Sequence, residues 1–508
     1  MPNTLAYLVL YSWPVAVYVL FRLFPRDWAI ALSMLGGYLL LPTRAGIDLP
    51  AVPPITKEAV PILSVGIMLL LGVGGAAAAQ HAPLRGKARG MWWFAGLVVL
   101  LLCISPLMTV LANAEPLIYG PVILPGMRLY DLASVGSVAV VMVLPYLVAR
   151  RHFTTAESHV TLLKAVVLAM MVYSLPTLFE VRMSPQLNIM IYGFFPHDFI
   201  QHIRAGGFRP IVFLQHGLWL AILFAMSIIA AVALWRQRVR DGGRAQQWLF
   251  AGIYLLLVLF ACRSLGALAL AMLILPVALF LGTRWQLLVA GTIAASVLLF
   301  PVLRSSGTIP VDKIVELAGS IDAERASSLQ FRLDNEDRLL ALAAQKPLTG
   351  WGTWGRNMIY DPQTGTALSV TDGAWVIVIG QFGWLGYIAQ FGMLTIPVIL
   401  LALGRRSLPV GPATAGLALV LAVNLLDLIP NATLTPITWM IAGALAGRYA
   451  FGHLGETDPK TVTPAPAPRR NWSLVTDPAG AEADPAPVAD ARPAVPARRT
   501  GRVRRDPA

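Results

Sequence analysis

Arginines, carboxylates and glycines are concentrated in one polar stretch of an otherwise apolar chain, residues 304 to 372. Arg332 and Arg338 lie six residues apart in it with carboxylates between them, and Asp372 closes it. Guanidinium groups match phosphate oxygens, and a partly desolvated carboxylate can accept a proton from a hydroxyl. At this spacing a helix places the two arginines on roughly opposed sides, so at most one faces a ligand while the other pairs with carboxylates. The pattern predicts an anion site with Asp372 as general base, although a salt-bridged surface helix would have the same spacing.

A second candidate anion site precedes it in the chain. Arg204 and Arg209 flank a pair of glycines, and guanidinium forks together with glycine amides can cradle phosphate oxygens. His216 follows seven residues after Arg209. We expect it just inside the next apolar segment, about two helical turns below Arg209, either as a substrate contact or as a packing residue.

Arg263 is the third candidate. It lies between two apolar segments that leave little room for a loop, so its guanidinium is expected at the outer end of a tight helical hairpin. An ionisable group near membrane depth is costly and usually functional. Snorkelling to lipid headgroups or capping of helix carbonyls would also explain its position.

Metal ligands are weakly represented. His197, Asp198 and His202 have a suggestive spacing, but a second well-placed carboxylate is missing. Cys103 and Cys262 both fall within apolar segments, where they offer neither a ligand set nor a disulfide. The sequence therefore predicts no metal and no other cofactor.

The elements that must position these residues are membrane helices. Hydrophobic residues make up 57% of the chain and charged residues 13%, and the mean hydropathy is +0.68, which excludes a soluble globular domain. The apolar segments predict an all-α polytopic membrane protein with about 13 transmembrane helices, and no strands are needed. The net charge of +13 indicates arginine-rich cytoplasmic loops rather than a nucleic-acid partner.

Basic clusters on alternate loops predict a topology with the N-terminus outside and the C-terminus inside. Residues 1 to 303 are expected to hold ten helices, with an outer loop at 180 to 209. Residues 304 to 372 form a large outer loop, and residues 373 to 451 hold three more helices. The first of these is expected to cross the membrane once, with several glycines in its first half. Residues 452 to 508, rich in proline, alanine and arginine, are expected to be a disordered cytoplasmic tail.

The order of these motifs resembles the O-antigen ligase and O-antigen polymerase superfamily of bacterial inner-membrane glycosyltransferases. The resemblance covers roughly residues 200 to 400. It rests on Arg263-Ser264-x-Gly266-Ala267 after an apolar segment, Arg332 in an outer loop, Pro347-Leu348-Thr349-Gly350-x-Gly352, and Gly383-x-x-Gly386 in the following segment.

This resemblance implies a GT-C-like architecture with a periplasmic catalytic loop in the bacterial inner membrane. It also implies metal-independent transfer of a glycan from undecaprenyl diphosphate. Arg263 and Arg332 would contact the diphosphate, supported by Arg204, Arg209 and Arg338. Expected partners are the lipid-linked glycan and membrane lipids, with room for other polysaccharide-assembly proteins.

One departure bears on the reaction. Where ligases and many polymerases carry His-Asn, this chain has Asp372-Gly373, and Gln381 stands where a glutamate is usual. The departure favours a polymerase of lipid-linked repeat units, in exopolysaccharide, capsule or O-antigen assembly, over an O-antigen ligase. A transporter or flippase for a lipid-linked substrate stays open, although the charges gather at the outer ends of segments and no repeat is visible.

Overall fold

The structure, a computed structural model, describes most of the chain outside the C-terminal tail. The described residues are 1–49, 52–74, 86–204, 206–308, 316, 319–320, 323–406, 408 and 410–455. The predicted tail beyond residue 455 and part of the predicted outer loop lie outside them.

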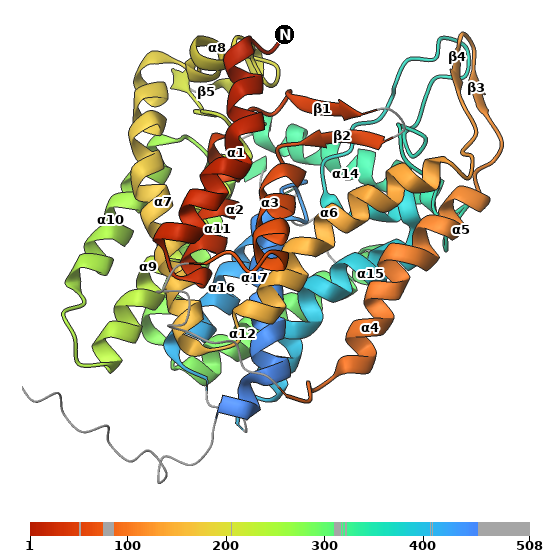
Figure 1. Ribbon diagram of the computed structural model, residues 1–508. Coiled ribbons are helices and arrows are strands. Elements are labelled where there is room, and N and C mark those ends of the chain that lie inside the picture. Colours follow the sequence, from red (N-terminus) through yellow and green to blue (C-terminus); the bar gives the residue numbers. More distant parts are fainter. Residues whose placement is uncertain are drawn as a thin grey trace, which may run out of the picture. The chain divides into compact units, whose positions relative to one another are not determined.

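Each apolar segment of the sequence contains a helix (Figure 1). These helices are α1 (Thr4–Leu23), α2 (Arg26–Leu40), α3 (Ala59–Leu70), α4 (Met91–Val99) continued by the π-helical turn η2 (Leu100–Ile104) and α5 (Ser105–Leu111), α6 (Asp131–His152), α7 (Ala156–Met183), α9 (Gly217–Arg240), α10 (Gln246–Ala261), α11 (Leu265–Phe280), α12 (Thr283–Ser305), α15 (Ala374–Leu403), α16 (Pro412–Asp427) and α17 (Pro436–Phe451).

Among the described residues, seven helices are long and apolar enough to cross a membrane: α1, the Met91–Leu111 helix, α6, α7, α9, α12 and α15. Shorter apolar helices include α3, α10, α11 and α16. The prediction of a helical membrane protein is therefore supported, while the count of about 13 crossings and the sidedness stay predictions.

The polar segments hold elements of their own. Two further helices are α8 (Leu187–Tyr192) and α14 (Ala323–Ala343). Contrary to the expectation that strands are not needed, three antiparallel hairpins form: β1 (Gly46–Leu49) with β2 (Val52–Thr56), β3 (Leu117–Tyr119) with β4 (Val122–Leu124), and β5 (Ile203–Arg204) with β6 (Gly207–Phe208). Figure 1 shows the hairpins, α8 and α14 towards the same end as the N-terminus, and we call this end the loop side.

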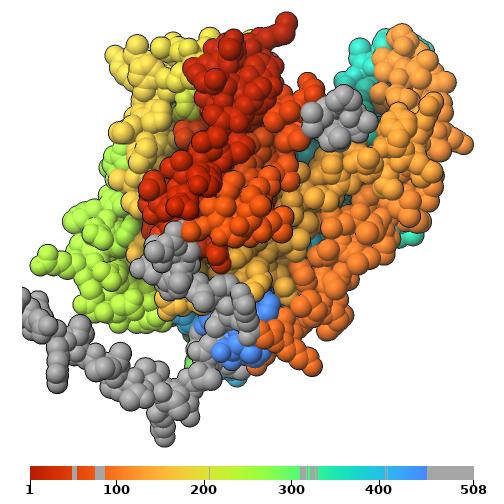
Figure 2. Space-filling view, in the orientation of Figure 1, coloured from red at the N-terminus to blue at the C-terminus, as the bar shows by residue number. Residues whose placement is uncertain are grey.

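The helices pack around α9, which is apolar and buried on nearly all sides by α7, α10, α11 and α16. Close approach elsewhere depends on small residues, as is common between membrane helices. Gly443 and Gly447 of α17 lie against the backbone of Tyr146 and Arg150 of α6. The helix α1 lies at the surface (Figure 2). It exposes apolar side chains along its length, as expected for a surface in contact with lipid.

The helix α15 is broken at Gly383, where φ is 62° and ψ is −161°. A segment of the polar stretch fills the break. The amides of Trp351 and Gly352 donate to α15 carbonyls just before it, at 2.8 and 2.9 Å, and the Trp384 amide just after it donates to the Pro347 carbonyl at 2.8 Å. The glycine-thinned crossing is therefore two half-helices clamped by the Pro347–Gly352 part of the polar stretch, which satisfies backbone groups that the break would leave unpaired.

Candidate functional site

The β5–β6 hairpin and the turn between α10 and α11 meet on the loop side. Arg263 occupies that turn in the left-handed region, with φ of 53°. Its Nη1 donates to the carbonyl of Arg204 at 3.1 Å. A Cβ at Gly207 would lie 2.6 Å from the guanidinium carbon of Arg263, so only glycine leaves room for this contact. The structure thus brings two of the predicted sites together across 59 residues of sequence.

Arg209 lies directly after the hairpin and is buried, with 9% of its surface exposed. Its side-chain stem packs against Gly217, the first residue of α9. Its Nε is buried and has no hydrogen-bond partner among the described residues. Burial, together with the positive charges of Arg204 and Arg332, lowers the pKa of Arg209 to about 10. Among the residues that the structure describes, no carboxylate shifts the pKa of this guanidinium, so it lacks there the counter-ion that a buried charge requires.

His216 does not lie inside the helix, and that prediction is wrong. The residues from Pro210 to His216 form turns, and α9 begins at Gly217. His216 instead caps α9, because its Nδ1 accepts the amide of Leu218 at 3.1 Å. The helix N-terminus, which favours anions, therefore begins where the stem of Arg209 packs.

Three histidine rings cluster beside this cap. The ring of His216 lies 4.9 Å from that of His197 and 5.0 Å from that of His202. Burial, together with the charges of the two other histidines and the nearby arginines, lowers the pKa of His216 to about 3. His216 is therefore neutral, and its Nε2 carries the hydrogen and can donate it. Within the described part of the chain, no group of three His, Cys, Asp or Glu side chains is arranged to hold a metal ion.

Arg332 and Asp372 form an ion pair, with 3.5 Å between Nε and Oδ2. The helix α14 and the segment before α15 are held in register next to it, because the Val370 amide donates to Oδ1 of Asn335 at 3.2 Å. Arg332 thus approaches both a carboxylate and the Arg209 region, whereas Arg338 is exposed on α14. Arg332, which the sequence predicts as a diphosphate contact, is thus the arginine that pairs with a carboxylate, and which of the two faces a ligand stays a prediction.

Glu336 is not among the site residues predicted from the sequence, although it lies four residues after Arg332 and on the same face of α14. It is 8% exposed, and burial raises its pKa to about 7. Arg304 and Arg332 oppose this rise, while Asp337 and Asp372 add to it. Arg304, at the end of α12, pairs with Asp337 at 2.6 Å. The i, i+4 spacing to Arg332 could have pointed to Glu336 as a site residue. The spacing does not show that Glu336 is buried.

Arg356 shows what a structural arginine in this region looks like. Its guanidinium donates to the carbonyls of Trp351, Pro125 and Glu115, at 3.1, 2.7 and 2.9 Å. Every nitrogen is used to hold loop backbone. Arg209 is also buried but differs in having an unpaired nitrogen and cationic neighbours.

A large apolar cavity of about 770 Å³ lies between α3, α6 and α17. Its lining includes Glu58 and Thr435 among mainly apolar side chains. Lys57, next to Glu58, donates to the Phe213 carbonyl at 3.1 Å, within the turns that connect Arg209 to α9. The loop that leads to Thr435 accepts the amide of Ala374, two residues after Asp372. The cavity is therefore connected to both segments that carry the site through the neighbours of its lining residues, although neither segment lines it.

No family model matches the sequence. No curated protein matches it either.

Proposed function

We propose that this protein is a membrane glycosyltransferase that joins lipid-linked oligosaccharide repeat units. Its donor would be a glycan on undecaprenyl diphosphate at the outer face of a bacterial inner membrane. Its products would enter exopolysaccharide, capsule or O-antigen assembly. The proposal combines the order of the sequence motifs with the arginine site described above.

The proposal depends most on the surroundings of Arg209. A buried guanidinium with an unpaired Nε and, among the described residues, no carboxylate acting on it has the requirements of an anion site rather than of a structural ion pair. Arg204 and Arg332 act on it electrostatically, Arg263 contacts Arg204, and the N-terminus of α9 adds its dipole. Cations contributed by separate segments suit a ligand with more than one phosphate group.

In the proposed reaction, an acceptor hydroxyl attacks the anomeric carbon of the donor. The bond from that carbon to the diphosphate oxygen breaks, and its electron pair stays on the diphosphate. Arg209, Arg263 and Arg332 stabilise the charge that develops there. Glu336, with a pKa near 7, accepts the hydroxyl proton. Asp372 would then act mainly by orienting Arg332, in place of the general-base role that the sequence suggests.

The apolar cavity supports a lipid carrier. Its volume of about 770 Å³ suits part of a long hydrocarbon chain, and most of its lining is apolar. A prenyl chain entering there would leave its diphosphate near the segments that carry Arg209 and Asp372. The lipid would thus provide binding affinity while the arginines select the headgroup.

A transporter or flippase is a second candidate because α15 is broken, and broken helices often form transport sites. Here the break is filled by the Pro347–Gly352 segment, which leaves fewer backbone groups for an ion or substrate. An O-antigen ligase is the nearest enzymatic alternative.

Deletion of the gene separates these functions through the lipid-linked intermediates that accumulate. A polymerase predicts single repeat units on the outer leaflet. A ligase would leave long lipid-linked chains there, and a flippase would leave repeat units on the inner leaflet. Unaltered surface glycans and intermediates would contradict all of them. Complementation by Arg128→Ala, an exposed arginine before α6, is the matched control for Arg209→Ala.

A further inference from the structure

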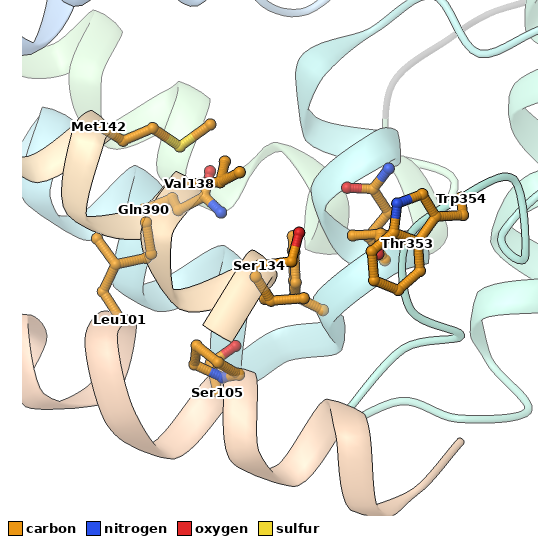
Figure 3. A pocket seen from close by; sticks show the side chains of 13 residues that line it. Leu101, Ser105, Ser134, Val138, Met142, Thr353, Trp354 and Gln390 are labelled. Carbon is orange, nitrogen blue, oxygen red and sulfur yellow. The ribbon is translucent and has the colours of Figure 1, made fainter. Parts of the chain in front are cut away.

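A smaller cavity of about 190 Å³ lies away from the arginines, between η2, α5, α6, α15 and the polar stretch after Gly352. Figure 3 shows Gln390 and Trp354 on opposite sides of it in this view, with Ser134 between them and Ser105 below. Gln381 and Thr353 also line it. The proposed reaction assigns nothing to this pocket.

In the described part of the chain, one buried polar atom of the pocket lacks a hydrogen-bond partner, and two further polar side chains of its lining are buried. Oγ1 of Thr353 is buried without a hydrogen-bond partner among the described residues. Gln390 is 5% exposed and Ser105 is 2% exposed, and each lines the cavity. Buried polar groups are nearly always paired, so the Thr353 hydroxyl is available to a ligand or water in the cavity.

Three backbone irregularities converge on the same cavity. The π-helical turn Leu100–Ile104 lies at its wall, the break of α15 at Gly383 directly follows two lining residues, and Trp354 has a left-handed φ of 57°. Such features are uncommon and tend to occur at binding sites. Their convergence supports a ligand site over a packing defect.

The lining defines the chemistry of the ligand. Within the described part of the chain, no charged side chain lines the cavity, so it does not suit a phosphate, a carboxylate or an amine. Hydroxyl and amide groups both donate and accept hydrogen bonds, as sugar hydroxyls do, and the exposed ring of Trp354 offers a flat apolar face. The volume is below the range of about 300–1,000 Å³ that drug-sized ligands occupy, which suits a single ring.

We propose that this pocket binds one uncharged sugar ring. As a subsite for the glycan, the assignment rests on the proposed function. Gln381 lies seven residues into α15 from Ala374, or roughly 10 Å along the helix. A short oligosaccharide spans that distance, so one ring can occupy the pocket while another is at the reacting centre near Asp372.

The test uses the full chain in phosphatidylcholine nanodiscs, because sugar-based detergents would compete. Saturation-transfer NMR measures binding of methyl glycosides of glucose, galactose, mannose and N-acetylglucosamine, with glycerol as the non-sugar probe. Gln390→Met and Thr353→Val remove hydrogen-bonding groups at similar volume. Gln345→Met, at an exposed position, is the matched control.

At least one glycoside should bind the wild-type protein and the Gln345→Met control. Binding should weaken about three- to tenfold in each pocket variant, as expected for one lost hydrogen bond. Absence of binding by every glycoside, or equal binding by the pocket variants, would overturn the proposal. Arg332→Ala should retain glycoside binding while losing transfer. If no transfer occurs in any assay but the pocket behaves as stated, only the proposed function fails.

Discussion

Nε of Arg332 lies 3.5 Å from Oδ2 of Asp372 and joins α14 to the segment that enters α15. With 42% and 34% of the two side chains exposed, the pair adds little to stability. Its consequence is geometric, because the carboxylate fixes the direction of a guanidinium that acts electrostatically on Arg209.

Asp372→Asn tests this positioning role. The amide keeps the shape and removes the charge, so Arg332 loses its orientation but remains cationic. We expect the kcat of transfer to fall about tenfold or less. The rise of the rate with pH should persist and begin at a lower pH, because the charge of Asp372 contributes to the raised pKa of Glu336. A loss as complete as that of Arg332→Ala would instead make Asp372 a catalytic group.

Glu336→Gln tests the proton acceptor. Because burial raises the pKa of Glu336 to about 7, its basic form appears only as the pH rises through that value. The rate of the wild-type enzyme should therefore increase between about pH 6 and 8. The glutamine variant should lack this increase and be slower by about 10²- to 10⁴-fold. An unchanged pH profile in the variant would remove Glu336 from the mechanism.

The raised pKa of Glu336 also makes the stability of the fold depend on pH. A carboxyl whose folded pKa exceeds its unfolded value stabilises the fold at low pH, and this contribution is lost as the pH rises through about 7. Glu336→Gln should thus raise the melting temperature at pH 8 relative to the wild-type protein, with less effect at pH 5. Equal shifts at both pH values would contradict a buried neutral carboxyl.

Gly217→Ala tests how Arg209 is held. The added Cβ would lie 2.5 Å from Cγ of Arg209 and 2.8 Å from the carbonyl oxygen of Pro210, so both the stem of Arg209 and the turn that follows it must shift. Alanine itself suits the first turn of a helix. We expect α9 to persist and inorganic pyrophosphate binding to weaken by about tenfold or more, measured by calorimetry. Gly96→Ala, where an added Cβ meets nothing within 4 Å, is the control. Equal pyrophosphate affinity in both variants would contradict the placement of Arg209.

Gly383→Ala tests the break in α15. Its φ of 62° and ψ of −161° are nearly restricted to glycine, and backbone strain alone should cost about 1–3 kcal/mol. An added Cβ would also lie 2.5 Å from the amide nitrogen of Thr349. A lower melting temperature is expected, whereas Gly392→Ala in the same helix meets only flexible side-chain ends and should change little. Equal melting temperatures would mean that the break is not required.

The helices were predictable from the sequence because long apolar segments have few other stable forms in a membrane. The contact between Arg263 and Arg204 was not, since it depends on where a hairpin and a distant turn meet. His216 was misplaced because apolar residues continue through the turns before α9, where composition does not reveal the helix start. The raised pKa of Glu336 comes from burial, which the i, i+4 spacing to Arg332 cannot indicate.

The most direct test of the arginine site compares three lipids on the purified full chain: undecaprenyl diphosphate, undecaprenyl phosphate and undecaprenol. Native mass spectrometry measures their relative affinities for the wild-type protein, Arg209→Ala and the Arg128→Ala control. The arginine site predicts that the wild-type protein and the control prefer the diphosphate over undecaprenol by about tenfold or more, and that Arg209→Ala loses this preference. Equal affinity for all three lipids in the wild-type protein, or an undiminished preference in Arg209→Ala, would contradict it.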